Sequence, residues 1–110
     1  MMKTISTLAA VMLTAFVGAA QADEAAQMAR GKELFNTAAV PACAVCHTLQ
    51  DAGAEGAIGP VLDEIKPDMA RVVRALQDGI GTMPSFKATM SEADIAAVAL
   101  YVSKASGGAK

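Results

Sequence analysis

Two cysteines and a histidine lie within five consecutive positions, Cys43-Ala44-Val45-Cys46-His47. They are the only cysteines and the only histidine in the 110 residues. Two thiols at this spacing can each bond one vinyl group along an edge of a porphyrin. A histidine directly after them then lies within reach of the iron. The pattern is therefore typical of covalent attachment of one c-type haem through Cys43 and Cys46, with His47 as an iron ligand.

Three other interpretations of the two cysteines explain less. A thioredoxin-like redox pair accompanies a βαβ pattern, and the sequence predicts no strand. A structural zinc site needs four ligands, whereas only three candidates are present. A structural disulfide suits an oxidising compartment but leaves the adjacent histidine without a role. Haem attachment accounts for all three residues.

The first 22 residues predict a cleavable export signal. Lys3 supplies a positive charge, an apolar stretch follows over 5–17, and Ala20-Gln21-Ala22 has the small-x-small pattern of a cleavage site. The apolar stretch is shorter than the roughly 18 residues that a membrane-spanning helix needs. We therefore expect residues 1–22 to be removed and residues 23–110 to form one domain without a membrane span. In a bacterium such a signal leads to the periplasm.

Charge and size narrow the function further. Loss of Lys3 changes the formal charge from −2 to −3, and the remaining Lys and Arg residues are scattered among acidic ones. No basic patch is visible, so nucleic acid is excluded as an expected partner. A domain this small buries only about 60–65% of its unfolded surface. We therefore expect the haem itself to reinforce the core.

Hydrophobic periodicity predicts an all-α domain. One helix is expected over 24–38 and a short helical turn over 61–65. A further helix has Pro67 in its first turn and ends at Gly79, and the last helix is capped by Ser91 and ends at Ser106. The Met69 side chain is assigned to the apolar face of the third of these. The glycine-rich segments between them are expected to be loops, and the tail beyond Ser106 to be frayed.

Met83 is the candidate for the sixth ligand of the iron. The mature chain has no second histidine, and its other methionines are Met28, Met69 and Met90. Met28 and Met69 are expected on helix faces as core filling, and Met90 directly precedes a helix cap. Met83 lies in a glycine-bounded loop and is followed by a proline. Histidine and methionine ligation is that of electron-carrying cytochromes c.

With these motifs the chain resembles the class I cytochromes c, the small monohaem bacterial type. The resemblance rests on the Cys-x-x-Cys-His motif, on Gly59-Pro60, and on the loop Gly79-x-Gly81-x-Met83-Pro84-x-Phe86. It implies a small cytochrome c fold of three to four helices wrapped around one covalently attached haem. It also implies that His47 and Met83 are the axial ligands and that the Pro60 carbonyl accepts a hydrogen bond from the ligand imidazole.

The same resemblance predicts that the first and last helices cross at a glycine and an aromatic residue. Gly31 and Phe35 match on one helix, and Val98 and Tyr101 on the other. The chain has no tryptophan to bind a haem propionate, unlike some relatives. A second, less specific resemblance covers 48–63 and is to small cytochromes that accept electrons from periplasmic sulfite dehydrogenases.

These features predict a periplasmic one-electron carrier and not an enzyme. An apolar rim of Ala44, Val45, Ile80 and Pro84 is expected to dock briefly with redox partners, a dehydrogenase as donor and an oxidase or another cytochrome as acceptor. The carrier is expected to be a monomer or to form transient complexes. Two alternatives remain open: a haem subunit permanently bound to a dehydrogenase, such as a sulfite-oxidising one, and an open-site haem enzyme or gas sensor.

Overall fold

The computed structural model describes residues 14–109. The expected signal peptide, residues 1–22, therefore lies partly outside the described residues, and its removal stays a prediction. None of the helices within 14–109 is long and apolar enough to cross a membrane.

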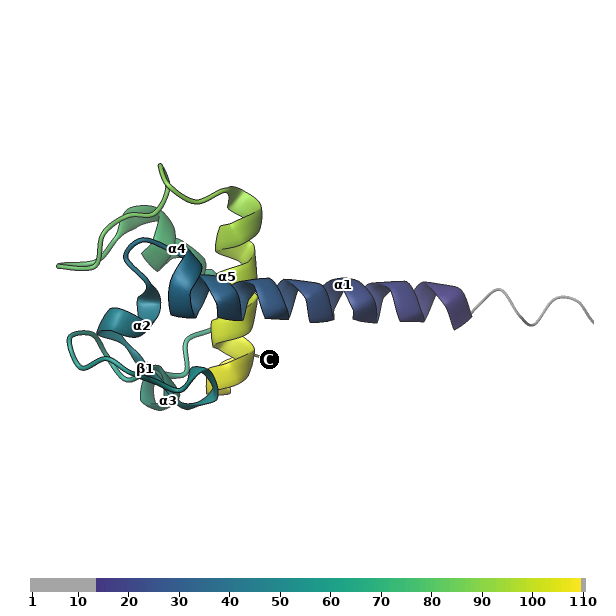
Figure 1. The fold of residues 1–110 in the computed structure, drawn as a ribbon, viewed down its shortest axis with the longest axis horizontal. Coiled ribbons are helices and arrows are strands. Elements are labelled where there is room, and N and C mark those ends of the chain that lie inside the picture. The colour runs from purple at the N-terminus through teal and green to yellow at the C-terminus, as the bar shows by residue number, and fades with distance from the viewer. Residues whose placement is uncertain (1–13, 110) are drawn as a thin grey trace, which may run out of the picture.

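Two long helices from opposite ends of the chain cross at the centre of the fold (Figure 1). α1 covers Thr14–Glu33 and continues into a short π-helical turn, η1, at Leu34–Ala38. α5 covers Glu92–Ser106. The first turns of α1 extend away from the rest of the protein, whereas its last turns pack on α5. The helix predicted over 24–38 is confirmed, although it begins earlier, at Thr14, and its last turn is π-helical.

The close approach of α1 and α5 depends on a glycine. A Cβ atom built on Gly31 would lie 2.6 Å from Tyr101 Cβ and would overlap the carbonyl oxygen of Ala97. Next to it, the buried ring of Phe35 meets the Tyr101 ring edge-on, with the centroids 6.0 Å apart. The predicted crossing is confirmed, but Ala97, and not Val98, faces the glycine together with Tyr101.

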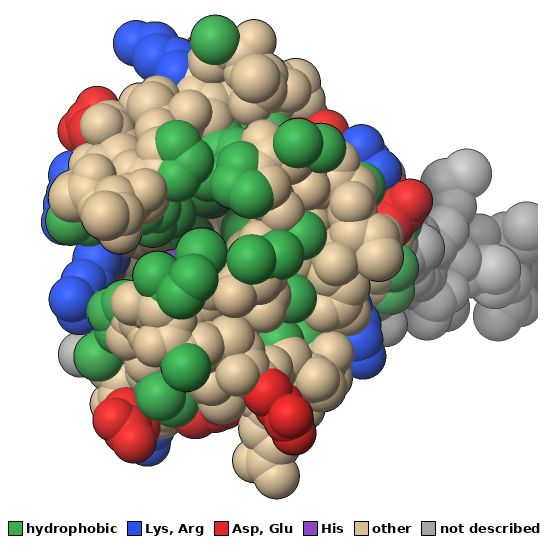
Figure 2. Space-filling view, turned by 60° about the vertical axis from the view of Figure 1, so that its left-hand side comes forward, with side chains coloured by type: hydrophobic (Ala, Val, Ile, Leu, Met, Phe, Trp, Pro, Cys, Tyr) green, Lys and Arg blue, Asp and Glu red, His purple; other side chains and the backbone are tan. Residues whose placement is uncertain are grey.

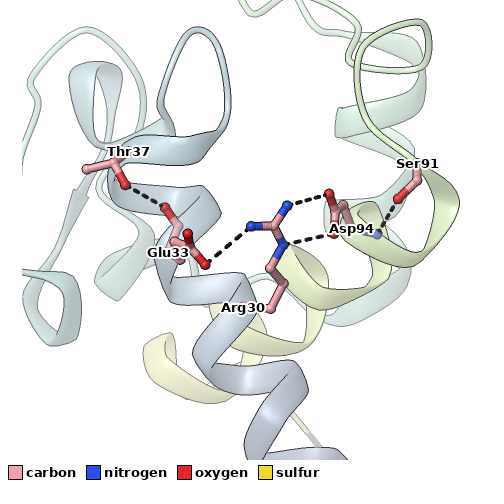
Figure 3. A network of polar contacts seen from close by, with 5 residues as sticks. All are labelled: Arg30, Glu33, Thr37, Ser91 and Asp94. Carbon is pink, nitrogen blue, oxygen red and sulfur yellow. Dashed lines mark hydrogen bonds and ion pairs between the residues drawn. The ribbon is translucent and has the colours of Figure 1, made fainter.

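A polar network joins the two helices beside the crossing (Figure 3). The Arg30 guanidinium donates two hydrogen bonds to the Asp94 carboxylate, at 3.1 and 3.0 Å, and a third to Glu33 at 3.2 Å. These two carboxylates raise the pKa of Arg30. Asp94 also donates its backbone N–H to Ser91 Oγ at 3.1 Å, which caps α5 as predicted. The network is largely exposed, so it orients the helices more than it stabilises them.

The chain beyond α5 is ordered, and the prediction of a frayed tail is wrong for the described residues. Gly107 ends the helix at a φ of 90°. The Gly108 N–H then donates to the Ser103 carbonyl at 2.7 Å. Gly108 is buried against the backbone of Lys66 and Pro67, where a side chain would not fit. Glycine therefore lets the tail pack on the segment before α4.

The two cysteines lie on a single helical turn, α2 (Cys43–Cys46), which precedes a small β-hairpin. Strand β1 (Thr48–Leu49) pairs antiparallel with β2 (Ala54–Glu55), and a 3₁₀ turn, η2 (Gln50–Ala52), joins them. Gly53 closes this turn with a φ of 65°. The sequence predicted a loop here and no strand; these strands have two residues each, too few to give a periodic signal.

Two further helices complete the fold. α3 (Leu62–Ile65) is the predicted short turn, and α4 covers Met69–Asp78. The Asp68 side chain caps α4 by accepting a backbone N–H of its first turn at 2.8 Å. Pro67 precedes this cap, so its predicted place in the first turn is wrong. Gly79 ends α4 at a φ of 72°, as predicted.

The buried side chains form one core between α5, the end of α1 and α4. Its largest fully buried members are Tyr101, Phe35, Leu49, Leu76 and Val98. Helices dominate residues 14–109, where β1 and β2 are the only named strands. The all-α prediction is confirmed: α1, α4 and α5 are long, and α2 and α3 are single turns.

Candidate haem site

A cleft of about 350 Å³ lies between α2, α3, α4 and α5 and opens on the face that Figure 2 shows. Hydrophobic side chains surround a hollow on this face, and charged ones lie toward the margins (Figure 2). Buried apolar side chains from η1, α3, α4, the loop after α4 and α5 line it, among them Phe35, Leu62, Val72, Leu76, Phe86, Val98 and Val102. The cleft is therefore suited to a flat apolar group.

Both cysteines line this cleft. They are separated by three positions on the single turn α2, a spacing that places side chains on the same face of a helix. Cys43 and Cys46 are free thiols of intermediate burial. Burial raises the pKa of Cys43 to about 11, so its thiol is neutral at pH 7. Two thiols on one face at the edge of a cleft can both reach the same flat ligand.

His47 follows α2 and also lines the cleft. Its Nδ1 atom lies 2.8 Å from the Pro60 carbonyl oxygen. A carbonyl only accepts, so Nδ1 carries the proton and donates it. In the neutral imidazole Nε2 is then the nitrogen with the free lone pair, and it has no hydrogen-bond partner among the described residues. This is the tautomer in which an imidazole can bind a metal through Nε2, and the Pro60 carbonyl holds it.

Two glycines press on the cysteine and histidine segment. A Cβ atom on Gly59 would lie 2.6 Å from His47 Cε1, and one on Gly56 would lie 2.6 Å from His47 N. The Gly59 N–H also donates to the Cys46 carbonyl at 2.6 Å. The backbone of Gly59 thus packs on the imidazole ring. The sequence placed Gly56 in a glycine-rich loop and Gly59 in the Gly59-Pro60 motif, and it did not predict the close approach of either backbone to His47.

Met83 enters the cleft from the loop after α4 and is half-buried. The other described methionines do not line the cleft. Met90 is buried in the core, and Met28 packs against the core from outside. Met69 is 39% exposed, so its predicted place in the core is wrong, because it faces outward at the first position of α4. Met83 is thus the one thioether of residues 14–109 that shares the cleft with His47.

Arg71 is a cleft residue that the sequence did not single out. It is exposed, and its side chain is the one cation among the residues that line the cleft. Within residues 14–109 its guanidinium makes no ion pair. It lies four residues before Ala75, another lining residue, on the same face of α4, and only the placement of α4 beside the cleft reveals this.

The residues present fit a haem, and they fit neither a zinc site nor a thioredoxin-like redox pair. The cleft offers apolar walls, two thiols, an imidazole with a free Nε2 and a thioether. No group of three His, Cys, Asp or Glu residues within 14–109 could hold a metal ion by itself. The two cysteines also lie on a helical turn followed by a β-hairpin, and no βαβ unit occurs in the described part of the chain.

An all-α domain that places a Cys-x-x-Cys-His segment in an apolar cleft is a c-type cytochrome. Residues 26–102 match the family described as cytochrome c oxidase, cbb3-type, subunit III, and the chain belongs to this family. A crystal structure of the c-type cytochrome SorU from Sinorhizobium meliloti is similar, with a TM-score of 0.71 and 50% sequence identity. That match covers 76% of this chain and 95% of SorU.

These comparisons confirm the resemblance to c-type cytochromes and the small cytochrome c fold. They also establish covalently attached haem c as the cofactor and electron transfer as the function. The roles of Cys43, Cys46, His47, Pro60 and Met83 remain predictions, which the geometry of the cleft supports.

Proposed function

We propose that the mature chain is a periplasmic one-electron carrier whose haem is bonded to Cys43 and Cys46 and whose iron is held by His47 and Met83. The observation that carries this proposal is the convergence of these four side chains in one apolar cleft. When bound, the haem supplies an iron centre that accepts and releases one electron. Because His47 and Met83 would both hold the iron, no substrate would reach it, and we propose no enzymatic activity.

Groups of the protein around the cleft would tune this centre. The backbone carbonyl of Pro60 accepts a hydrogen bond from His47 Nδ1–H, which holds the ring and makes its other nitrogen more basic. A thioether ligand such as Met83 favours the reduced state relative to a second histidine. The apolar lining acts in the same direction, because a low dielectric disfavours the extra positive charge of the oxidised state. Together they support a relatively high reduction potential.

Exposed apolar side chains lie at the cleft and on the neighbouring turn α2. Val45 is 60% exposed and Ile80 is 65% exposed, and Pro84 is exposed as well, in line with three members of the expected rim. Ala44 is half-buried, whereas Ile58, 71% exposed and lining the cleft, joins the rim. We propose that this rim docks briefly with periplasmic redox partners, a dehydrogenase donor and an oxidase or cytochrome acceptor. Encounters of this kind bury small interfaces.

The proposal includes export and cleavage after Ala22. Residues 23–110 would then form the cytochrome domain, and α1 would begin near Asp23 instead of at Thr14. Comparing the mass of the purified periplasmic protein with that expected for a start at Asp23 tests this point. A mature protein that retained residues before Asp23 would contradict it.

A second candidate is a haem subunit held permanently in a larger redox complex. The name of the matching family, which describes an oxidase subunit, favours it, and a dehydrogenase, including a sulfite-oxidising one, is the other expected host. Gel filtration of the native protein separates the candidates. A free carrier elutes at the mass of one small domain, whereas a permanent subunit elutes with its complex.

The axial assignment is tested with Met83→Ala. Haem should stay covalently attached, as detected by haem staining on a denaturing gel, because the two cysteines are intact. The reduced variant should bind carbon monoxide, which the wild type should resist at neutral pH. Met90→Ala and Met69→Ala are matched controls, and a change in these variants but not in Met83→Ala would refute the assignment. Wild-type carbon monoxide binding would instead favour the open-site sensor or enzyme.

A further inference from the structure

The loop that carries Met83 starts and ends at the C-terminal end of α4. Ile80 and Met83 exchange two backbone hydrogen bonds, Ile80 N–H to Met83 O at 3.0 Å and Met83 N–H to Ile80 O at 2.9 Å. Gly81, with a φ of 57°, allows the tight turn between them. These bonds fix the shape of the turn but do not attach it to the rest of the protein.

Ser85 provides such an attachment. Its hydroxyl donates to the Gln77 carbonyl at 2.5 Å and accepts the Lys87 N–H at 3.2 Å. One residue later, the Phe86 N–H donates to the Leu76 carbonyl at 2.7 Å. Both acceptors belong to the last turn of α4, where carbonyls have no partner within the helix. The loop thus uses the free end of α4 as its anchor.

Among the described residues, Ser85 is the only side chain of 79–86 that forms a hydrogen bond outside this loop. Phe86 is a separate anchor, because its side chain is buried and its bond to α4 is made by the backbone. Ser85 is the attachment nearer to Met83, with only Pro84 between them. The ring of Pro84 fixes its φ. A displacement of Ser85 therefore also displaces Met83.

The packing at this point is tight. A Cβ atom on Gly79 would lie 2.8 Å from the Met83 carbonyl oxygen and 2.9 Å from Ser85 N. The end of α4 is therefore in direct contact with the backbone on both sides of Pro84. Loss of the hydroxyl at Ser85 would leave this contact in place but remove the bond that holds the loop against it.

We propose that Ser85 is a positioning residue whose hydroxyl clasps the Met83 loop to the last turn of α4 and so limits how often the Met83 thioether leaves the iron. This inference rests on the proposed role of Met83 as axial ligand. The hydroxyl has no contact with the cleft; it acts through the loop backbone. Its loss favours the open form of the loop and lets small external ligands compete for the position of Met83.

The expected size follows from the bond that is lost. A hydrogen bond of a neutral hydroxyl makes a modest net contribution to stability, and Ser85 is exposed to competing water. Its removal should raise the population of the open loop by a factor of about 2 to 10. Because the external ligand binds only the open form, its apparent affinity should rise by the same factor.

The experiment titrates the oxidised holoprotein with imidazole and follows the far-red absorption band of the iron–thioether bond. Ser85→Ala should bind imidazole about 2- to 10-fold more tightly than wild type, and Ser85→Thr, which keeps the hydroxyl, should restore wild-type affinity. Ser91→Ala is the matched control, because it removes a serine hydroxyl bond at the start of α5. It should lower the thermal midpoint without changing the imidazole affinity.

Wild-type affinity in Ser85→Ala would overturn the proposal. An equal rise in Ser91→Ala would also overturn it, since the effect would then follow global stability. Met83→Ala, measured in parallel, reports on the proposed function. If that variant keeps the thioether band, the axial assignment fails. If it loses the band while Ser85→Ala behaves as wild type, only the role of Ser85 fails.

Discussion

Gly31→Ala tests the helix crossing that defines this fold. The new Cβ would meet Tyr101 Cβ at 2.6 Å and Ala97 C at 2.9 Å, and would overlap the Ala97 carbonyl oxygen. None of these is the mobile end of a side chain, so the helices themselves must separate. Overpacking of this kind costs about 1–3 kcal/mol, and the rigid neighbours favour the upper value. Alanine regains about 1 kcal/mol of helix propensity, so the net loss is about 2 kcal/mol.

A loss of this size lowers the thermal midpoint by about 8–16 °C for a domain of under 100 residues. Thermal unfolding of the holoprotein, followed by far-ultraviolet circular dichroism, measures it. Ala29→Gly is a control on the same helix at an exposed position, and it should cost only the propensity of about 1 kcal/mol. The haem spectrum of Gly31→Ala should stay native, because the cleft is elsewhere. A Gly31→Ala protein as stable as wild type would refute the reasoning.

Three further predictions concern charge and protonation. Burial and the Asp51 hydrogen bond, with Asp63 nearby, raise the pKa of Tyr101; the folded state therefore holds this proton more tightly than the unfolded state. This difference stabilises the fold fully below pH about 10, and the free energy of unfolding then falls by up to about 1.4 kcal/mol per pH unit. In urea titrations at alkaline pH, the stability of Tyr101→Phe should therefore fall less steeply with pH than that of the wild type. Arg71→Gln should lower the reduction potential by about 20–50 mV, because a cation at the cleft favours the reduced state. Arg74 lies outside the cleft lining, so Arg74→Gln should lower the potential less. Equal shifts of the two variants in voltammetry would contradict this. Stopped-flow electron transfer to an acidic-faced partner should accelerate with salt, because the mature chain is acidic, and a steep fall would show clustered lysines.

The sequence was sufficient for the site wherever chemistry demands particular residues at a particular spacing. The Cys43–His47 motif and the loop methionine were recognisable because few other roles account for them, and the structure brings both into one cleft. Helix ends were also predictable where a side chain or a glycine has a local effect. Ser91 caps α5, and Gly79 ends α4.

What the sequence could not supply depends on contacts between distant segments. Gly59 has the same appearance in a sequence whether it lies in an open loop or packs on an imidazole. Arg71 resembles the other scattered basic residues until α4 is placed beside the cleft. The β-hairpin and the packed tail at Gly108 escaped notice for the same reason, since both are short and depend on a partner elsewhere.

The crossing of α1 and α5 has a consequence for the order in which the chain folds. The bond between Arg30 and Asp94 closes a loop of 64 positions, at an entropic cost of about 4 kcal/mol. That cost cannot be recovered before the last helix exists, because α1 has its main partner there. A chain in which α5 has not yet packed on α1 therefore stays open, and Cys43 and Cys46 remain accessible until that contact forms.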